Sequence, residues 1–196
     1  MKSIILASQS PRRKQLLEQA GVAFDIVPAH IDETPYLNYI PSDAVSASAQ
    51  AKADQVCSQF PDHWIIAADT IVVINNRILG KPDSRNHARK MLQTLSGKVH
   101  VVYTGYSICC LKQNIKITDI VKTNVQFKDL CSDEIEWYLQ TDEPYDKAGA
   151  YAIQGIGAFI IKSIDGSYTN VVGLPVCEVM DVLMKQNIIK RKSNEY

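Results

Sequence analysis

Residues 8–13, Ser-Gln-Ser-Pro-Arg-Arg, combine two guanidinium groups with a run of backbone amides where an apolar strand is predicted to meet a helix. Ser10 is a typical N-cap and Pro11 a favoured first helical residue. The first amides of a helix lack internal partners and carry partial positive charge, which stabilises an anion. Arg12 and Arg13 add planar donors that can hold phosphate oxygens bidentately. The hexapeptide therefore indicates either a phosphate site or a capped surface helix with solvated arginines.

Two acidic positions follow predicted strands. Asp32 and Glu33 come directly after the second strand, and adjacent carboxylates repel each other unless a cation or metal relieves the repulsion. Taken alone, this pair is better explained as a solvated turn. Asp69 and Thr70 end a strand that is wholly apolar, and an acid there fits a turn or a metal ligand and base equally well.

A segment dense in small residues, 146–157, would let a flat ligand approach the backbone. Gln154 lies within it, and its amide both donates and accepts hydrogen bonds, as reading the edge of a nucleobase requires. A structural turn explains the glycines equally well. Residues 165–175 resemble another tight passage between strand and helix, and Lys52 taken alone is a lone cation on a helix surface.

Composition excludes several classes of protein. The 196 residues include 21 basic and 21 acidic side chains, so no overall field exists to hold duplex nucleic acid or an anionic membrane. The five cysteines are odd in number and lack C-x-x-C spacing, which argues against a disulfide framework or zinc cluster and predicts reduced, mostly buried thiols. The start is too short for a signal peptide and no apolar run reaches membrane-spanning length, so we expect a cytoplasmic protein.

Strand and helix patterns alternate, which predicts one α/β domain over residues 1–189 and a polar tail over 190–196. A break is expected at Asp69 and Thr70, a tight hairpin at 75–76 and a turn at 113–114. The predicted strands are 3–7, 24–27, 64–68, 71–74, 77–79, 99–111, 115–127 and 158–164. The predicted helices are 11–20, 43–58, one capped by Asp83 or Ser84 and ending at 96–97, 132–140 and 175–184.

Nine segments, in order and spacing, resemble the Maf family of nucleoside triphosphate pyrophosphatases. They are 8–13, 32–33, Lys52, 68–70, 80–82, 95–97, 146–151, 153–155, and 166–168 followed by 172–175. The resemblance covers nearly the whole chain. It implies an α/β fold with a central mixed twisted sheet flanked by helices, two lobes around a deep cleft, a shape related to the inosine triphosphate pyrophosphatases, and a homodimer.

Within that family, residues 146–155 resemble the branch that acts on dTTP and UTP rather than on 7-methyl-GTP. The resemblance implies that water attacks the α-phosphorus and releases monophosphate and pyrophosphate, with Mg²⁺ or Mn²⁺ as cofactor. Asp69 matches the general base, and Asp69 and Glu33 are the expected metal ligands, although sequence does not separate base from ligand. The expected substrate-binding residues are Ser8, Arg12, Arg13, Glu33, Lys52, Thr70, Lys81 and Gln154.

Other interpretations stay open at this point. One is a nucleotide-binding regulatory protein linked to cell-division control, and another is a house-cleaning hydrolase of modified pyrimidines such as 5-methyl-UTP or pseudo-UTP. A phosphotransferase is disfavoured because no G-x-x-x-x-G-K-[ST] loop is present. Gln9 and residues 141–144 depart from the family pattern, and we expect neither departure to affect the chemistry.

Overall fold

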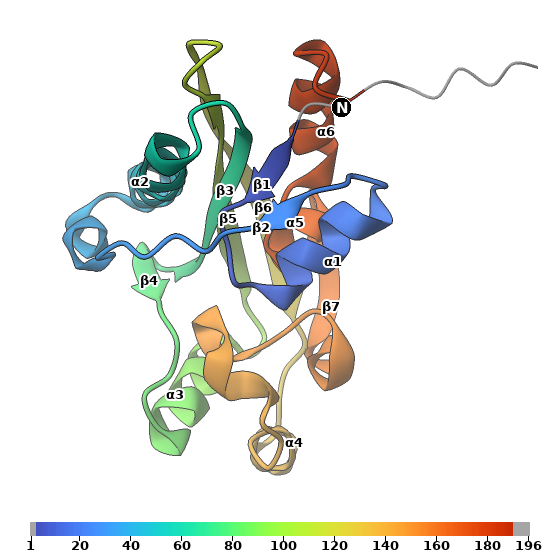
Figure 1. The fold of residues 1–196 in the computed structure, drawn as a ribbon. Helices are drawn as coiled ribbons and strands as arrows, with labels where there is room; N and C mark the ends of the chain where they lie inside the picture. Colours follow the sequence, from blue (N-terminus) through green and yellow to red (C-terminus); the bar gives the residue numbers. More distant parts are fainter. Residues whose placement is uncertain (1–2, 190–196) are drawn as a thin grey trace, which may run out of the picture.

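A mixed seven-stranded sheet organises the computed structural model, which describes residues 3–189 (Figure 1). The strand order is β2-β1-β3-β5-β6-β7, and β4 pairs with β3 off this path. β1 is parallel to β2 and β3, and the other pairings are antiparallel. The strands are β1 Ile4–Leu6, β2 Asp25–Ile26, β3 Trp64–Ile74, β4 Arg77–Leu79, β5 Val99–Cys110, β6 Ile115–Phe127 and β7 Ile161–Asp165. The predicted tail, 190–196, lies outside the described residues, and the extent of the domain stays a prediction.

Helices cover both faces of the sheet. The α-helices are α1 Pro11–Gln19, α2 Pro41–Gln59, α3 Arg85–Leu95, α4 Ser132–Tyr138, α5 Tyr168–Val172 and α6 Val176–Lys185. Four short 3₁₀ helices connect them: η1 Thr34–Asn38, η2 Glu143–Asp146, η3 Ala148–Ala150 and η4 Gly155–Ile160. In Figure 1, α3 and α4 lie at one end of the sheet, and α2 and α6 flank the other.

The hydrophobic core is divided into clusters on the two faces of the sheet and at one end of it. Ile65 and Ala67 pack with α2, whereas their neighbours in sequence, Ile66 and Ala68, pack with α1 and α6, because successive strand residues face opposite sides. A further cluster joins α3 and α4 to the far halves of β3, β5 and β6. The expected mixed sheet between helices, with two lobes, is therefore confirmed.

Helix α2 lies unusually close to the sheet. A Cβ at Gly105 of β5 would collide with the backbone of Val45 and Ser46, so only glycine allows this approach. On the helix side, small buried residues such as Ala49 and Ala53 leave the same space free. The close approach brings the middle of α2 over the centre of β3.

Most predicted elements are confirmed, including the long antiparallel pair and the hairpin, where Asn75 and Asn76 adopt φ of 50° and 60°. Ser84 rather than Asp83 caps α3, because its hydroxyl accepts from the backbone N–H of His87 at 3.1 Å. Three of the five cysteines are buried and all are free thiols. Within residues 3–189, none of the helices combines the length and apolar character needed to cross a bilayer.

The predicted break at Asp69 and Thr70 is wrong. β3 continues through both residues because β5 pairs with it without interruption from Ile65 to Val73. The polar dipeptide interrupts the apolar pattern but not the hydrogen-bond ladder. The predicted strand 158–164 also begins later, at Ile161, because the preceding residues form η4. Helix α5 was missed because its five residues were taken for a connection.

Candidate active site

The edge of β3 is open at its centre. On the side away from β5, β1 pairs with Trp64 to Ile66 and β4 pairs with Val72 to Ile74. Among the described residues, no strand pairs with 67–71 on this edge. A cavity of about 710 Å³ lies here, which explains how residues in mid-strand come to face a ligand site.

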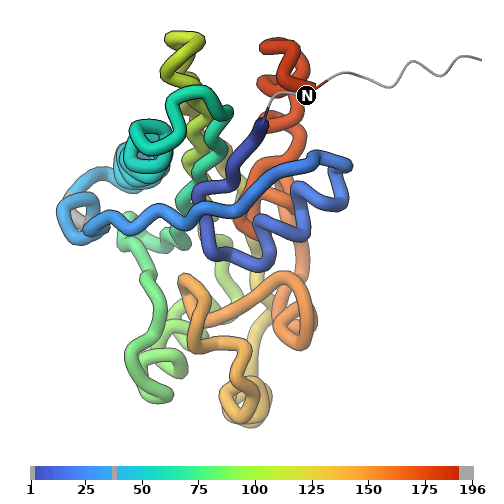
Figure 2. The backbone as a smooth tube through the Cα atoms, viewed as in Figure 1, coloured from blue at the N-terminus to red at the C-terminus, as the bar shows by residue number. Residues whose placement is uncertain are grey.

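All nine residues singled out from the sequence line this one cavity. They are Ser8, Arg12, Arg13, Glu33, Lys52, Asp69, Thr70, Lys81 and Gln154. Gln9, the departure from the family pattern, lines it as well. The walls come from distant parts of the chain. In Figure 2 the segment with α1 is blue and the segment with the later 3₁₀ helices is orange, so more than a hundred residues separate them in sequence.

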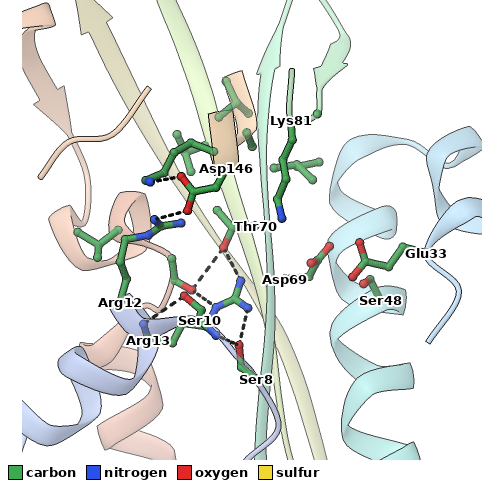
Figure 3. Close-up of a pocket in the computed structure, with 18 of the residues that line it drawn as sticks. Ser8, Ser10, Arg12, Arg13, Glu33, Ser48, Asp69, Thr70, Lys81 and Asp146 are labelled. Carbon is green, nitrogen blue, oxygen red and sulfur yellow. Dashed lines mark hydrogen bonds and ion pairs between the residues drawn. The ribbon is translucent and has the colours of Figure 1, made fainter. Parts of the chain in front are cut away.

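Asp69 and Thr70 contact different helices. Because they are consecutive in a strand, their side chains point to different faces of the sheet. The Asp69 carboxylate accepts from Lys52 of α2 at 2.7 Å. The Thr70 hydroxyl accepts from Arg13 of α1 at 3.2 Å (Figure 3). One dipeptide therefore connects both helices to the exposed strand edge.

The guanidinium of Arg13 is held entirely by neutral oxygens. It donates from Nε to the carbonyl of Gly173 at 2.7 Å and from its two Nη atoms to the hydroxyls of Ser8 and Thr70 at 3.1 and 3.2 Å. Burial lowers the pKa of Arg13, and the charge of Asp69 opposes that effect. Three of its five N–H groups are thus engaged, and the remaining donors and the positive charge favour an arriving anion.

Lys52 lies between two carboxylates. Its ammonium is 2.6 Å from Glu33 and 2.7 Å from Asp69, and its side chain is only 11% exposed, so the interpretation as a helix-surface residue is wrong. Two carboxylates thus face a single ammonium group. The carboxylates of Glu33 and Asp69 lie close enough together to suit a divalent metal. Mg²⁺ typically binds one or two carboxylates and completes its coordination shell with phosphate and water. Among residues 3–189 there is no group of three or more His, Cys, Asp or Glu side chains that could hold a metal ion.

The loop that carries Glu33 is fixed by α2. The side chain of Gln55 accepts from the backbone N–H of His30 at 2.6 Å and donates to its carbonyl at 2.7 Å. Glu33 follows within the same loop as the N-cap of η1. The same helix thus supplies Lys52 and positions the acid that contacts it.

The opposite wall carries a second group of charges. Arg12 lies 3.9 Å from Asp146, which also pairs with Lys147. Burial alone would raise the pKa of Asp146, but Lys147 and Arg12 outweigh it and lower that pKa. Lys81, from the loop after β4, is exposed and extends its ammonium toward the cavity (Figure 3). Gln154 lines the cavity from the segment between η3 and η4.

The model of the Maf-like protein family matches residues 3–186, which is nearly all of the described chain. The chain belongs to the Maf family. It is 48% identical over 182 residues to a dTTP/UTP pyrophosphatase of Syntrophus aciditrophicus, covering 93% of this chain and 89% of that protein. It is 47% identical to a dTTP/UTP pyrophosphatase of Clostridioides difficile over 183 residues, covering 93% and 94%.

Solved structures support the fold of this Maf protein. A HAM1 protein from Coxiella burnetii superposes with a TM-score of 0.52 at 13% identity, covering 94% of this chain and 100% of that one. The Ham1 protein of Staphylococcus aureus gives the same TM-score at 11% identity, covering 95% and 100%. At such low identity the likeness concerns the arrangement of strands and helices only.

Several lining residues of the Maf cavity were not among the predicted site residues. Ser48 lies one helical turn before Lys52, is buried, and has a hydroxyl without a protein partner. Its spacing of four from Lys52 was the available signal. Asp146 and Lys147 were noted within the small-residue segment and within the family resemblance over 146–151, but not as site residues. Gly173 contributes its backbone carbonyl, which the residue type does not indicate. Chemically, the cavity offers donors for several phosphate oxygens beside a carboxylate that can accept a proton.

Proposed function

We propose that this Maf protein hydrolyses dTTP and UTP to the nucleoside monophosphate and pyrophosphate. The observation that carries the proposal is the convergence of Arg13, Lys52 and Lys81 with Asp69 on one cavity, in a chain 46–48% identical to proteins named dTTP/UTP pyrophosphatases. Phosphoryl chemistry needs charge neutralised and a water positioned, and this set of residues supplies both.

The cationic side chains bind the triphosphate. Arg13 is preorganised by its three neutral partners, so little rotational freedom is lost when it meets phosphate oxygens. Each charged hydrogen bond of this kind contributes about 1.5–3 kcal/mol. The side chain of Arg12 is 30% exposed and Lys81 is exposed, so these two hold the parts of the triphosphate that lie nearer to solvent.

Asp69 orients or deprotonates the water that attacks the α-phosphorus. Its carboxylate belongs to the part of β3 with the open edge and accepts a hydrogen bond from Lys52, which orients it. Asp69 and Glu33 are the residues that would hold Mg²⁺ or Mn²⁺, and such an ion, when bound, would neutralise charge on the phosphate oxygens. Pyrophosphate leaves readily because its negative charge is shared with the cationic side chains.

Gln154 reads the base. The edge of uracil or thymine presents a carbonyl acceptor, a ring N–H donor and a second carbonyl, and one primary amide pairs with two of these groups. The same edge occurs in 5-methyl-UTP and pseudo-UTP, so modified pyrimidine nucleotides belong to the proposed substrate class. We further propose a cytoplasmic homodimer that acts on small nucleotides, with neither nucleic acid nor membrane as a partner.

The deciding experiment incubates the purified protein with a panel of nucleoside triphosphates and Mg²⁺ or Mn²⁺ and measures pyrophosphate and orthophosphate separately. We expect pyrophosphate from dTTP and UTP, no orthophosphate, and no product after chelation with EDTA. In ¹⁸O-labelled water the label should enter the monophosphate, because attack occurs at the α-phosphorus. Tight nucleotide binding without turnover would instead support the regulatory protein, and label in the pyrophosphate would contradict the site of attack.

A further inference from the structure

Glu143 forms a hydrogen-bonded bridge to the segment that carries Gln154. One carboxylate oxygen accepts from the hydroxyl of Tyr138 at 2.8 Å and from the backbone N–H of Gly157 at 2.7 Å. The other accepts from the backbone N–H of Ile156 at 3.0 Å. These two amides belong to the first turn of η4, so a side chain from η2 caps a helix twelve residues further along the chain.

Tyr138 extends the bridge to the other side of Gln154. Its hydroxyl donates to Glu143 and accepts from the backbone N–H of Ala152 at 3.2 Å. The ring is fully buried, and burial together with Glu143 raises the pKa of Tyr138, so the hydroxyl stays a donor at neutral pH. The pair therefore holds the backbone two residues before Gln154 and two residues after it.

The segment has no room to move relative to this pair. A Cβ at Gly155, where φ is +77°, would collide with the Glu143 carboxylate. A Cβ at Gly157 would lie 2.5 Å from the carbonyl oxygen of Ala152 and 2.6 Å from the hydroxyl of Tyr138. The two glycines thus let the backbone approach the carboxylate closely enough for both amides to bond it, and these bonds restrain the segment.

Rigidity matters here because a primary amide is nearly symmetric in shape. A half-turn about its last torsion exchanges the carbonyl and the amino group, and the exchanged form pairs with cytosine, whose edge offers an amino donor and a ring-nitrogen acceptor. The side chain of Gln154 alone therefore does not separate uracil from cytosine. Selection requires that the amide and the surrounding backbone be held in one arrangement.

We infer that Glu143 is a positioning residue for base selection: through Tyr138 and the amides of Ile156 and Gly157, its carboxylate fixes the segment that presents Gln154 to a pyrimidine. The inference rests on the proposed function. It assigns a role in specificity to a side chain outside the cavity lining, and it separates the setting of substrate ranking from the chemistry at Asp69.

The test compares kcat/KM for UTP with kcat/KM for CTP in the wild type, Glu143→Gln and Glu143→Ala. The ratio of the two values does not depend on the fraction of protein that is folded, so a merely structural loss would leave it unchanged. We expect the ratio to fall about tenfold in Glu143→Ala, which removes all three acceptor contacts. In Glu143→Gln it should fall less, because the amide oxygen still accepts while its amino group opposes the N–H of Ile156.

Tyr138→Phe provides a second variant. It keeps the Glu143 carboxylate and its bonds to the amides of Ile156 and Gly157, but it removes the hydroxyl that links Glu143 to Ala152. It should lower the UTP-to-CTP ratio in the same direction, which keeps the inference testable if the Glu143 variants fold poorly. Glu136→Gln is the matched control, because Glu136 joins α4 to Arg85 and Arg89 of α3 and makes no contact with the segment. Its ratio should equal that of the wild type.

An unchanged ratio in Glu143→Ala or Tyr138→Phe, with activity still measurable, would overturn the inference. So would a wild type that hydrolyses UTP and CTP equally well. In both cases pyrophosphate release from UTP would still stand, so the proposed function would survive. A wild type without any turnover of UTP would instead remove the proposed function itself, and the inference with it.

Discussion

The two walls of the cavity are built in different ways. The phosphate wall is made of Ser8, Arg13, Lys52, Asp69 and Thr70. All but Ser8, which lies in the loop between β1 and α1, belong to a long strand or an α-helix. The base wall, made of residues 146–157, runs through three short 3₁₀ helices and contains no strand or α-helix. Backbone hydrogen bonds within the sheet and the helices fix most of the phosphate wall. Hydrogen bonds from side chains to the backbone fix the base wall.

This difference indicates how each wall tolerates change. In the phosphate wall the pairing of β3 with β5 fixes the backbone. Replacing one charged side chain there therefore changes the charge of the cavity but not the position of the backbone. In the base wall the frame depends on a few acceptors such as Glu143. We therefore expect mutations in the phosphate wall to slow all substrates together, and mutations in the base wall to change the ranking of substrates.

The largest effect is expected for Asp69→Asn. Losing the base should lower kcat by about 10³-fold for UTP and CTP alike, because general-base catalysis typically contributes 10²–10⁴-fold. Steady-state pyrophosphate release checks the rate, and an unchanged thermal midpoint shows that the fold is intact. Near-normal turnover in Asp69→Asn together with inactive Glu33→Gln would reassign the base to Glu33.

Arg13→Lys is expected to have the next largest effect. Lysine keeps the charge but cannot reach Gly173, Ser8 and Thr70 together, so the cation loses its fixed position. We expect kcat/KM to fall about 100-fold for UTP, with the UTP-to-CTP ratio unchanged. Arg85→Lys, at an exposed arginine paired with Glu136, should be indistinguishable from the wild type. A shifted ratio in Arg13→Lys would contradict the separation of the two walls.

Acid should weaken the base wall through His100. Its ring is buried against Phe127 and Tyr151, its Nε2 bonds the Tyr151 hydroxyl at 2.6 Å, and its Nδ1 has no partner. Burial lowers the pKa of His100 to about 4. The unfolded chain, with an ordinary pKa near 6.5, binds the proton first, so stability is present above pH 6.5 and is lost as pH falls toward 4.

From pH 7 to pH 5 this one group should reduce the free energy of unfolding by roughly 2 kcal/mol, measured by urea titration at both values. His100→Phe removes the titrating ring and should flatten the pH dependence by that amount. The variant will be less stable at neutral pH, because the hydroxyl of Tyr151 loses its partner. Equal losses in variant and wild type between pH 7 and pH 5 would show that His100 is not responsible.

The smallest effect, about tenfold, is expected for Gln154→Glu. A carboxylate only accepts hydrogen bonds, so it repels the carbonyls of uracil and favours the amino group of cytosine. The UTP-to-CTP ratio should fall while the sum of the two activities changes little. An unchanged UTP-to-CTP ratio would show that Gln154 does not recognise the base.

Local patterns predicted most of the elements. Ser10 and Pro11 started α1 as expected, because capping depends on residues within one turn. The strand break at Asp69 and Thr70 failed because polarity was treated as a local stop signal, whereas the ladder to β5 is formed by residues more than thirty positions away. Glu143 was noted only within residues 141–144, which depart from the family pattern, and nothing local indicates that it bonds amides thirteen and fourteen residues later.

The sequence by itself determined the order of strands and helices, the family resemblance and the residue types of the site, because propensities, caps and motif spacing are local properties of the chain. Only the tertiary structure decided which groups meet. The hydrogen bond from Arg13 to Gly173 spans 160 positions, and the contact of Lys52 with Asp69 depends on how closely α2 approaches β5. Such contacts arise from sheet pairing and close packing, which are set by the whole fold rather than by any one segment.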